Sequence, residues 1–190
     1  MGQKWRSMPE NGNNITAPRI GNEASSQRNG WYALRVRDRS EARVAQVLNL
    51  KQYRCFLPCW EKRKRYSDRI VRVSAAAFPG YLFCQLDPDD RVGILNTPGV
   101  QSILGTAGYP EAIGEDVILA LQKAFSSGRS VLHAPYMRSG CLVRVQTGPM
   151  TGIIGRLVRV KGQDQLVISV NLLGRSVSVE LNSDSVDVLQ

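Results

Sequence analysis

The stretch "GPMTGIIGRLVRV" (residues 148–160) decides the fold of the C-terminal part of the chain. Its apolar residues alternate as in a β-strand, yet Gly148, Gly152 and Gly155 interrupt the alternation. Glycine inside a strand loses side-chain packing and costs ordering entropy, so these residues need a geometric reason. Two reasons are available: a tight turn with a sharp corner in the strand, or close approach by the backbone of a partner.

The surrounding sequence favours the turn with a corner. Residues 141–190 contain five short alternating segments with tight turns between them, which predict a small SH3-like β-barrel. In this barrel Gly148-Pro149 makes a tight loop, and Gly152 and Gly155 let the next strand bend where side chains do not fit. The five segments are "CLVRVQ", "GIIGRLVRVKG", "DQLVISV", "RSVSVEL" and "SVDVL".

The preceding region combines amphipathic helices with strands. Residues 38–52 carry apolar side chains at helical spacing, with Asp38 and Glu41 at the spacing of a capping box. Residues 114–128 show a second apolar stripe that ends at Gly128. A short helix is expected to start in "DPDDRVGILN" (87–96), with Asp87 as its cap and Pro88 at its first position. The predicted strands are "WYALRV" (31–36), "CFLPCW" and the basic stretch after it, with a turn near 66–68, "FPGYLFCQLD" (78–87) and "QSILG".

This order of elements predicts an α+β class with two domains. We expect a disordered tail over 1–29, an antiparallel sheet with helices on one side over 30–125, a polar linker over 126–140 and the barrel over 141–190.

The net charge of +9 favours a polyanionic partner. The charge is concentrated in "EKRKRYSDRIVR" (61–72), where six basic residues accompany two acidic ones. This run is either a solvated hairpin tip or a nucleic-acid contact. No apolar run approaches the roughly 18–20 residues of a membrane span, and residues 1–29 lack a signal core. We therefore expect a cytoplasmic protein with no membrane partner.

Few residues in the sequence are arranged as a metal site or an enzyme active site would need. Four cysteines (55, 59, 84 and 141) and one histidine (His133) do not form a zinc pattern, so ordinary reduced thiols and no metal are expected. The sequence contains no Walker loop, no GxSxG, no HExxH and no GxGxxG. We expect no catalytic residues, no cofactor and no enzymatic activity.

Several motifs together resemble the NusG family. "VRVQTGPMTGIIGRLVRV" looks like a KOW motif, whereas "FPGYLF" and "WYALRV" look like the NGN domain of that family. "NTPGV" (96–100) and "LLGRSVSVEL" (172–181) extend the likeness over about 160 residues. The resemblance implies an NGN domain, a short linker and a KOW domain, in a transcription elongation factor that acts as a monomer on RNA polymerase.

The resemblance also implies a polymerase-binding pocket. NGN domains of the family dock an apolar pocket onto the clamp helices of the β′ subunit and reach toward the β subunit. The matching residues are Phe78 and Tyr81, with Tyr32 as a weaker choice. Aromatic anchors in a concave apolar patch are suited to gripping a helix. The alternative is that Phe78 and Tyr81 fill the core.

Nucleic-acid contacts are implied for a second set of residues. In some relatives the dipeptide matching Asn96-Thr97 contacts the non-template DNA strand. Amide and hydroxyl groups can bind base edges and phosphate. The alternative is that Asn96-Thr97 is only a helix-ending turn. Further candidates for holding nucleic acid are Arg91, Lys62, Arg63, Lys64 and Arg65.

The KOW barrel of relatives binds the termination factor Rho or a small-subunit ribosomal protein. The matching turn holds Leu172, Leu173 and Arg175. The tail and the long basic hairpin are nearer to specialised antiterminator paralogues, so we expect a factor that suppresses pausing or termination. Two alternatives remain: the general NusG, acting in Rho-dependent termination and in coupling to translation, and a KOW-type protein that binds ribosomal RNA.

Overall fold

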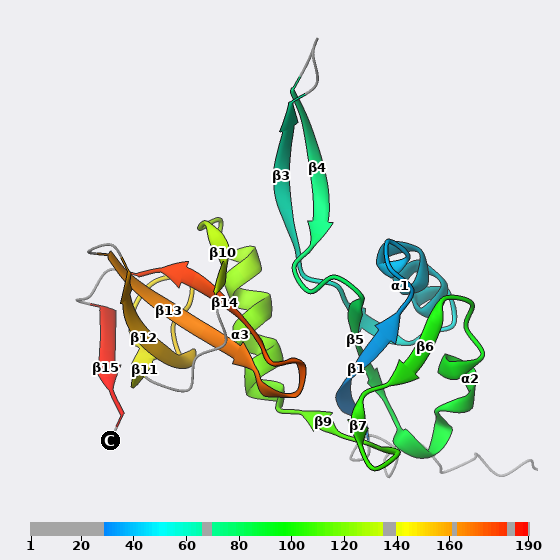
Figure 1. The fold of residues 1–190 in the computed structure, drawn as a ribbon. Coiled ribbons are helices and arrows are strands. Elements are labelled where there is room, and N and C mark those ends of the chain that lie inside the picture. Colours follow the sequence, from blue (N-terminus) through cyan, green and yellow to red (C-terminus); the bar gives the residue numbers. More distant parts are fainter. Residues whose placement is uncertain (1–28, 66–69, 135–139, 161–162, 182–184, 190) are drawn as a thin grey trace, which may run out of the picture.

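A computed structural model describes residues 29–65, 70–134, 140–160, 163–181 and 185–189. The predicted tail, apart from Asn29, and the predicted turn at 66–68 lie outside these residues. Figure 1 shows an N-terminal sheet, a C-terminal barrel, a helix between them and a two-stranded hairpin that stands apart. The predicted α+β class is confirmed.

The N-terminal sheet is antiparallel and has the order β2-β5-β1-β6, with β9 also pairing with β1. The predicted strand at 31–36 is present as the central strand β1. The strand predicted from residue 78 starts three residues later, because Phe78, Pro79 and Gly80 form a turn in which Gly80 has φ +83°. The strand bounds are β1 Gly30–Val36, β2 Arg54–Phe56, β5 Tyr81–Leu86, β6 Val100–Ile103 and β9 Ala112–Ile113.

The helix predicted over 38–52 is shorter and begins without the expected capping box. Helix α1 spans Glu41–Leu50, and Ser40 is its N-cap without a side-chain hydrogen bond. The Glu41 carboxylate is buried and accepts a hydrogen bond from the backbone N–H of Gly80 at 2.8 Å. The Glu41 carboxylate, which would have bound a backbone N–H of its own helix in a capping box, binds Gly80 instead. This hydrogen bond ties α1 to the turn before β5.

The helices lie on both faces of the sheet, so the expectation of helices on one side is wrong. Side chains of Leu34, Val36 and Leu82 pack in one apolar cluster with α1 and with α2 (Val92–Leu95). Trp31 and Phe83 belong to another cluster, which includes α3 (Glu115–Ser126). Alternate residues of a strand point to opposite faces, and both faces of β1 and β5 are apolar.

Several short elements complete the N-terminal domain. Asp87 caps the 3-10 helix η1 (Pro88–Asp90) as predicted, accepting from the N–H of Asp89 at 3.0 Å. Strands β3 (Cys59–Arg65) and β4 (Ile70–Ala76) form the hairpin that stands apart in Figure 1. A smaller hairpin, β7 (Gly105–Thr106) with β8 (Tyr109–Pro110), was not predicted.

All five predicted barrel strands are present, and a sixth is added. The sheet has the order β10-β14-β13-β12-β11-β15. Strand β10 (Val131–Ala134) falls in the segment that the sequence analysis assigned to the linker and pairs antiparallel with β14. The other bounds are β11 Cys141–Val145, β12 Ile154–Val160, β13 Gln163–Val170, β14 Arg175–Glu180 and β15 Val186–Val188.

The three glycines of the opening stretch have two different roles. Gly148 and Gly152 have φ of +87° and +84° and lie in the loop before β12, so Gly152 serves the turn and does not bend the strand. Gly155 lies in β12, where a Cβ would come within 2.8 Å of Leu166 Cδ1 and 2.9 Å of the Val167 carbonyl oxygen. Only Gly155 therefore marks a place where β13 leaves no room for a side chain.

The sheet and the barrel share one apolar cluster. Helix α3 contacts both β1 and β13 (Figure 1). The Lys123 ammonium, on α3, donates to the carbonyl oxygen of Thr151 in the barrel at 2.7 Å. The cluster runs from Trp31 and Phe78 to Val143 and Val177 without a break. The barrel thus covers part of one sheet face.

Candidate functional site

The aromatic residues Phe78 and Tyr81 sit on either side of the turn that leads into β5. Phe78 is 1% exposed, and its ring meets the edge of the Phe83 ring with centroids 5.6 Å apart. Tyr81 is half-buried and packs against the same apolar cluster. The predicted core-filling alternative therefore describes Phe78 in this arrangement, whereas Tyr81 lies at the rim.

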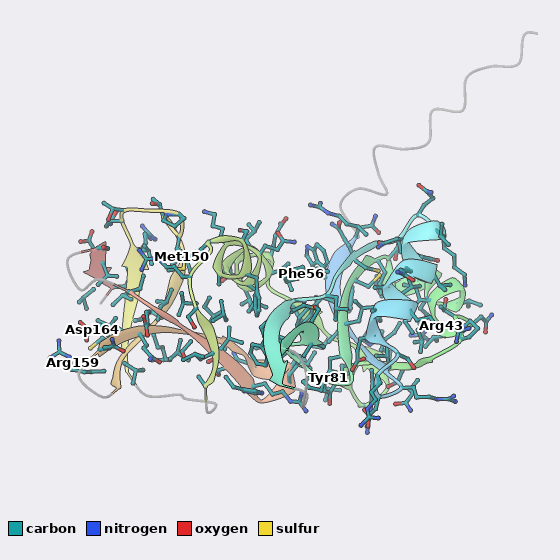
Figure 2. The ribbon with its side chains drawn as sticks, turned by 90° about the horizontal axis from the view of Figure 1, so that it is seen from above. Arg43, Phe56, Tyr81, Met150, Arg159 and Asp164 are labelled. Carbon is teal, nitrogen blue, oxygen red and sulfur yellow. The ribbon has the colours of Figure 1, made fainter. Side chains whose placement is uncertain are left out.

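The turn that was expected to bind a barrel partner covers this aromatic pair. The Arg175 guanidinium lies over the Tyr81 ring, 5.0 Å from its centroid, and its Nη1 donates to the Pro79 carbonyl oxygen at 3.1 Å. Leu172 and Leu173, in the 3-10 helix η2 (Asn171–Leu173), pack against the same cluster. Figure 2 shows Tyr81 beside the barrel strands. Two surfaces predicted to bind different partners thus contact one another.

Tyr32 does not lie beside Phe78 and Tyr81. It lies on the other face of β1, where it belongs to the cluster of α1 and α2 and is almost fully buried. Burial raises the pKa of the Tyr32 hydroxyl, and the nearby carboxylates of Asp87 and Asp89 raise it further. The structure therefore separates Tyr32 from Phe78 and Tyr81, since residues 32 and 33 of a strand point to opposite faces.

Asn96 and Thr97 lie at the end of α2 in different environments. Asn96 is the exposed C-cap residue. Thr97 is 1% exposed; its hydroxyl donates to the Gly93 carbonyl oxygen at 3.0 Å and accepts from the Lys51 ammonium at 2.8 Å. The Thr97 side chain is therefore part of a helix-ending turn, whereas Asn96 is available on the surface. Arg91 is also exposed, at the start of α2.

Sequence reasoning missed Lys51. Its ammonium donates to Thr97 and also to the carbonyl oxygen of Gly93 at 3.0 Å, so it places a positive charge at the end of α2 next to Asn96. An isolated lysine after a helix carries no periodic signal that could have identified it.

The basic residues 62–65 lie in β3, within the projecting hairpin of Figure 1. Their backbone pairs with β4, from Lys62 opposite Val73 to Arg65 opposite Ile70. The hairpin stands away from Asn96 and Arg91, so the nucleic-acid candidates do not form one continuous cluster.

The cysteines are free thiols in the described structure. Cys55 and Cys84 are cross-strand neighbours with their sulfurs 3.6 Å apart. The hydrogen bond between the two thiols lowers the pKa of Cys55 and raises that of Cys84, and burial raises the latter further. Across the described residues no three His, Cys, Asp or Glu side chains gather as a metal site would need. None of the helices in that part of the chain has the length and hydrophobicity to cross a membrane.

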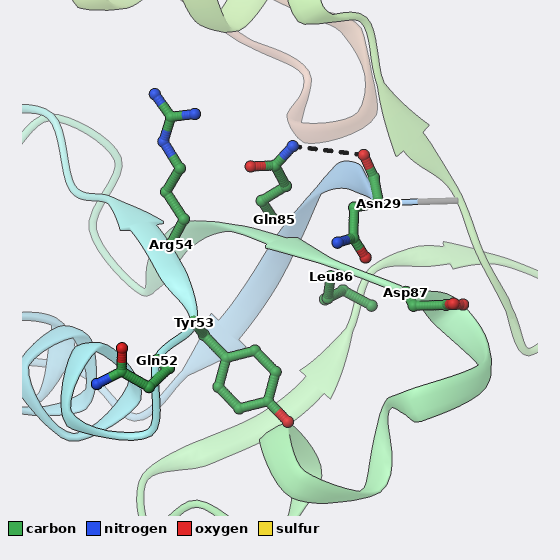
Figure 3. Close-up of a pocket in the computed structure, with 7 residues that line it drawn as sticks. All are labelled: Asn29, Gln52, Tyr53, Arg54, Gln85, Leu86 and Asp87. Atoms are coloured by element: carbon green, nitrogen blue, oxygen red, sulfur yellow. Dashed lines mark hydrogen bonds between the residues drawn. The ribbon is translucent and has the colours of Figure 1, made fainter. Parts of the chain in front are cut away.

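In the part of the chain that the structure describes, polar pockets lie at two places along the sheet. One, of about 270 Å³, lies at the ends of β1, β2 and β5 and includes none of the predicted site residues (Figure 3). Its Gln85 side-chain amide donates to the Asn29 carbonyl oxygen at 3.4 Å. The other lies beside Tyr81 and includes Arg35 and Arg37, which sequence reasoning also missed. Their alternation with the inward-facing Val36 was the signal that could have found them.

The comparisons with known proteins agree with this architecture. The family model described as "Transcription termination factor nusG" matches residues 29–122. A "Transcription termination/antitermination protein NusG" of Staphylococcus carnosus is 24% identical over 174 residues, which cover 84% of this chain and 95% of the relative. The protein of the same name from Halalkalibacterium halodurans is 27% identical over 168 residues, covering 82% and 92%.

A solved structure described as "Domain interaction in Thermotoga maritima NusG" shares the fold. Its TM-score is 0.50 at 16% identity, and the match covers 87% of this chain and 99% of that one. An NGN-like sheet followed by a KOW-like barrel defines a transcription factor of the NusG type. The chain belongs to the NusG family.

Proposed function

We propose that this protein is a transcription elongation and antitermination factor that binds RNA polymerase through the surface around Phe78 and Tyr81. The observation that carries the proposal is the contact of Arg175 with that surface, over the Tyr81 ring and at the Pro79 carbonyl oxygen. An apolar, aromatic surface that a second domain has to cover is a surface with affinity for other apolar groups. The clamp helices of the β′ subunit are the partner that the family resemblance favours, with contacts reaching the β subunit.

Binding then requires the two domains to separate. The part of the cover that lies on Tyr81 and Pro79 consists of one cation–π contact and one hydrogen bond, which is a small contact area, whereas the rest of the domain contact is the apolar packing of the barrel against α3. Contacts of this size are worth a few kcal/mol at most, so a large polymerase interface can displace them. A factor held in this arrangement acts only where something opens it, as expected for a specialised antiterminator.

Separation would also free the barrel turn. Leu172, Leu173 and Arg175 then form a small apolar patch with one cation, suited to a protein partner. Rho and a small-subunit ribosomal protein are the two candidates. Recruitment of Rho would make the protein act as a general NusG in termination, and mapping its occupancy along a genome, with and without Rho, distinguishes that alternative from the proposed role.

We assign the contact with the non-template DNA strand to Asn96, with Lys51 beside it. Asn96 is exposed and its amide can bind a base edge, whereas the Lys51 ammonium can face a phosphate. Thr97 holds the Lys51 ammonium in place by accepting its hydrogen bond, and it ties itself to the end of α2 by donating to the Gly93 carbonyl oxygen. The hairpin with Lys62, Arg63, Lys64 and Arg65, together with Arg91, provides further positive charge for nucleic acid.

The polymerase surface is tested by the substitution Tyr81→Ala in the full chain. We expect the affinity for core RNA polymerase to fall at least about 30-fold, because a central aromatic anchor contributes about 2 kcal/mol or more. Tyr109→Ala is the matched control, since Tyr109 is an exposed tyrosine of the same domain that lies outside the surface. Circular dichroism checks that both variants are folded.

The substitution Leu173→Asp is expected to have the opposite effect on polymerase binding. A carboxylate placed against the apolar cluster opens the cover, so we expect polymerase binding to increase while binding of a barrel partner is lost. If the folded Tyr81→Ala protein binds polymerase as well as the Tyr109→Ala control does, the assignment of the surface is wrong.

A further inference from the structure

A pocket of about 310 Å³ lies where the edge of the N-terminal sheet meets the barrel. Its walls come from the end of β1, the turn before β5, the strand β6 and the start of β14. The side chains that matter for its chemistry are those of Arg35, Arg37, Asp38, Tyr81, Gln101 and Arg175.

The strand pattern explains why cations gather at this pocket. On β1, Trp31 and Ala33 face the barrel side and are buried in the shared cluster. Arg35 continues the same face, because residues two apart on a strand point the same way, and Arg37, just beyond the end of β1, lines the same pocket. Arg35 lies directly opposite Tyr81 in the β1–β5 ladder. The buried apolar face therefore ends in two arginines at the rim.

The third cation of the pocket, Arg175, belongs to the barrel. Arg175 stacks on the Tyr81 ring, next to Arg35 in the sheet register. Among the residues that the structure describes, none of these three guanidinium groups forms an ion pair. One carboxylate, Asp38, lines the pocket with them. Like charges from two domains thus face a common space without enough negative charge to balance them.

We propose that this pocket binds a small phosphorylated anion held between guanidinium groups of both domains. Arginine presents planar pairs of N–H donors that match phosphate oxygens, and it stays charged at any physiological pH. The Gln101 amide adds a neutral donor and acceptor. The volume lies at the lower end of ligand pockets and accommodates a diphosphate group. Three cations outnumber the carboxylate of Asp38 and that of Glu41, which is bound to the Gly80 N–H in the pocket wall, so net positive charge remains for an anion.

The anion would also strengthen the contact between the domains. Without it, Arg175 approaches Arg35 against like-charge repulsion; with it, both guanidinium groups are attracted to the same phosphate. A ligand that contacts both domains favours the closed arrangement by its differential affinity for that arrangement. The effect on polymerase binding rests on the proposed function, whereas anion binding itself does not.

The test measures binding of inorganic pyrophosphate to the full chain at about 0.15 M ionic strength, where distant charges are screened, by calorimetry and by chemical shifts of isotope-labelled protein. We expect shifts at Arg35, Tyr81 and Arg175. The variants Arg35→Gln and Arg175→Gln should each weaken binding about ten-fold or more, because each removes hydrogen bonds to a charged group. Arg43→Gln is the matched control: it changes the net charge equally, and Arg43 lies on α1 away from Tyr81 (Figure 2). We expect it to change the affinity less than about two-fold.

Four results would overturn the proposal. One is the absence of pyrophosphate binding, and another is equal weakening by Arg43→Gln, which would indicate a general charge effect. Binding of sulfate as tight as that of pyrophosphate would indicate an unspecific oxyanion site. Stronger binding of a short single-stranded oligonucleotide with the same shifts would indicate nucleic acid instead. Polymerase binding of Tyr81→Ala, measured without pyrophosphate, tests the proposed function separately.

Discussion

The two faces of the N-terminal sheet are covered in different ways. One face is closed by α1 and α2, which follow or precede their sheet strands closely in the sequence; apolar side chains fill it, and the hydrogen bonds of Glu41 and Thr97 lie at its border. The other is closed by α3 and by a turn of the barrel, whose Arg175 reaches Tyr81 from 94 residues further along the chain and whose two leucines pack against the shared apolar cluster. The first cover belongs to the fold, whereas the second can be removed without unpairing a strand of the sheet.

The largest effect is expected on the permanently closed face. Leu48→Ala on α1 removes a fully buried side chain, and we expect the free energy of unfolding of the N-terminal domain to fall by about 2–5 kcal/mol, measured by urea denaturation. Leu50→Ala, two residues further and 81% exposed, is the control and should change stability by less than about 0.5 kcal/mol. Equal effects of the two substitutions would show that α1 does not close this face.

A substitution that destabilises the barrel should loosen the cover of the sheet face that the barrel closes and leave the face closed by α1 and α2 unchanged. Gly155→Ala brings a Cβ to 2.9 Å from the Val167 carbonyl oxygen, a backbone atom that cannot move away easily. We expect the barrel to lose about 1–3 kcal/mol of stability through overpacking. Hydrogen exchange resolved by residue measures this: amides of β12 and β13 should exchange faster, and amides of α1 should not change.

The control for this variant is Ile154→Ala, on the same strand but partly exposed, where no overpacking arises. If Gly155→Ala accelerates exchange in α1 as strongly as in the barrel, the two domains unfold as one unit and the contrast between the faces fails.

The contact between the domains is tested directly by Arg175→Ala. It removes the stacking on Tyr81 and the hydrogen bond to Pro79, so we expect the closed arrangement to lose about 1–2 kcal/mol relative to the open one. Arg175→Lys keeps the charge but loses the planar stacking, and it should have an intermediate effect. The measurement is the rotational correlation time of each domain by NMR relaxation. Unchanged values in both variants would mean that the shared apolar cluster and the packing on α3 hold the domains together without Arg175.

The difference between local contacts and contacts between domains explains which parts of the fold could be predicted from the sequence. Alternation in 31–36 and 141–190 identified strands correctly, because the period of two is a local property. The pairing of Arg175 with Tyr81 has no local signal, since it depends on how two domains meet. Strand β10 was missed because its residues lie in a polar stretch and pair only with distant β14.

The site was predictable only in part for the same reason. "FPGY" identified Phe78 and Tyr81 as a pair around a turn, which the structure places on one apolar cluster. Tyr32, the weaker choice that the resemblance implied, faces the other way because a single residue step reverses the direction of a strand side chain. The hydroxyl of Thr97 looked available in the sequence and is instead bonded within its own turn.

The smallest effect is expected at this turn, on the face that the local helices close. Thr97→Val keeps the shape of the side chain but removes its hydrogen bonds to Gly93 and Lys51, so we expect the N-terminal domain to lose about 1 kcal/mol of stability, measured by urea denaturation. Asn96→Ala should leave stability unchanged, because Asn96 is exposed, and should instead alter pause lifetimes in transcription assays on templates with different non-template strands. If Thr97→Val alters pause lifetimes without altering stability, then the Thr97 hydroxyl contacts the DNA itself. In that case its hydrogen bonds to Gly93 and Lys51 do not stabilise the helix-ending turn.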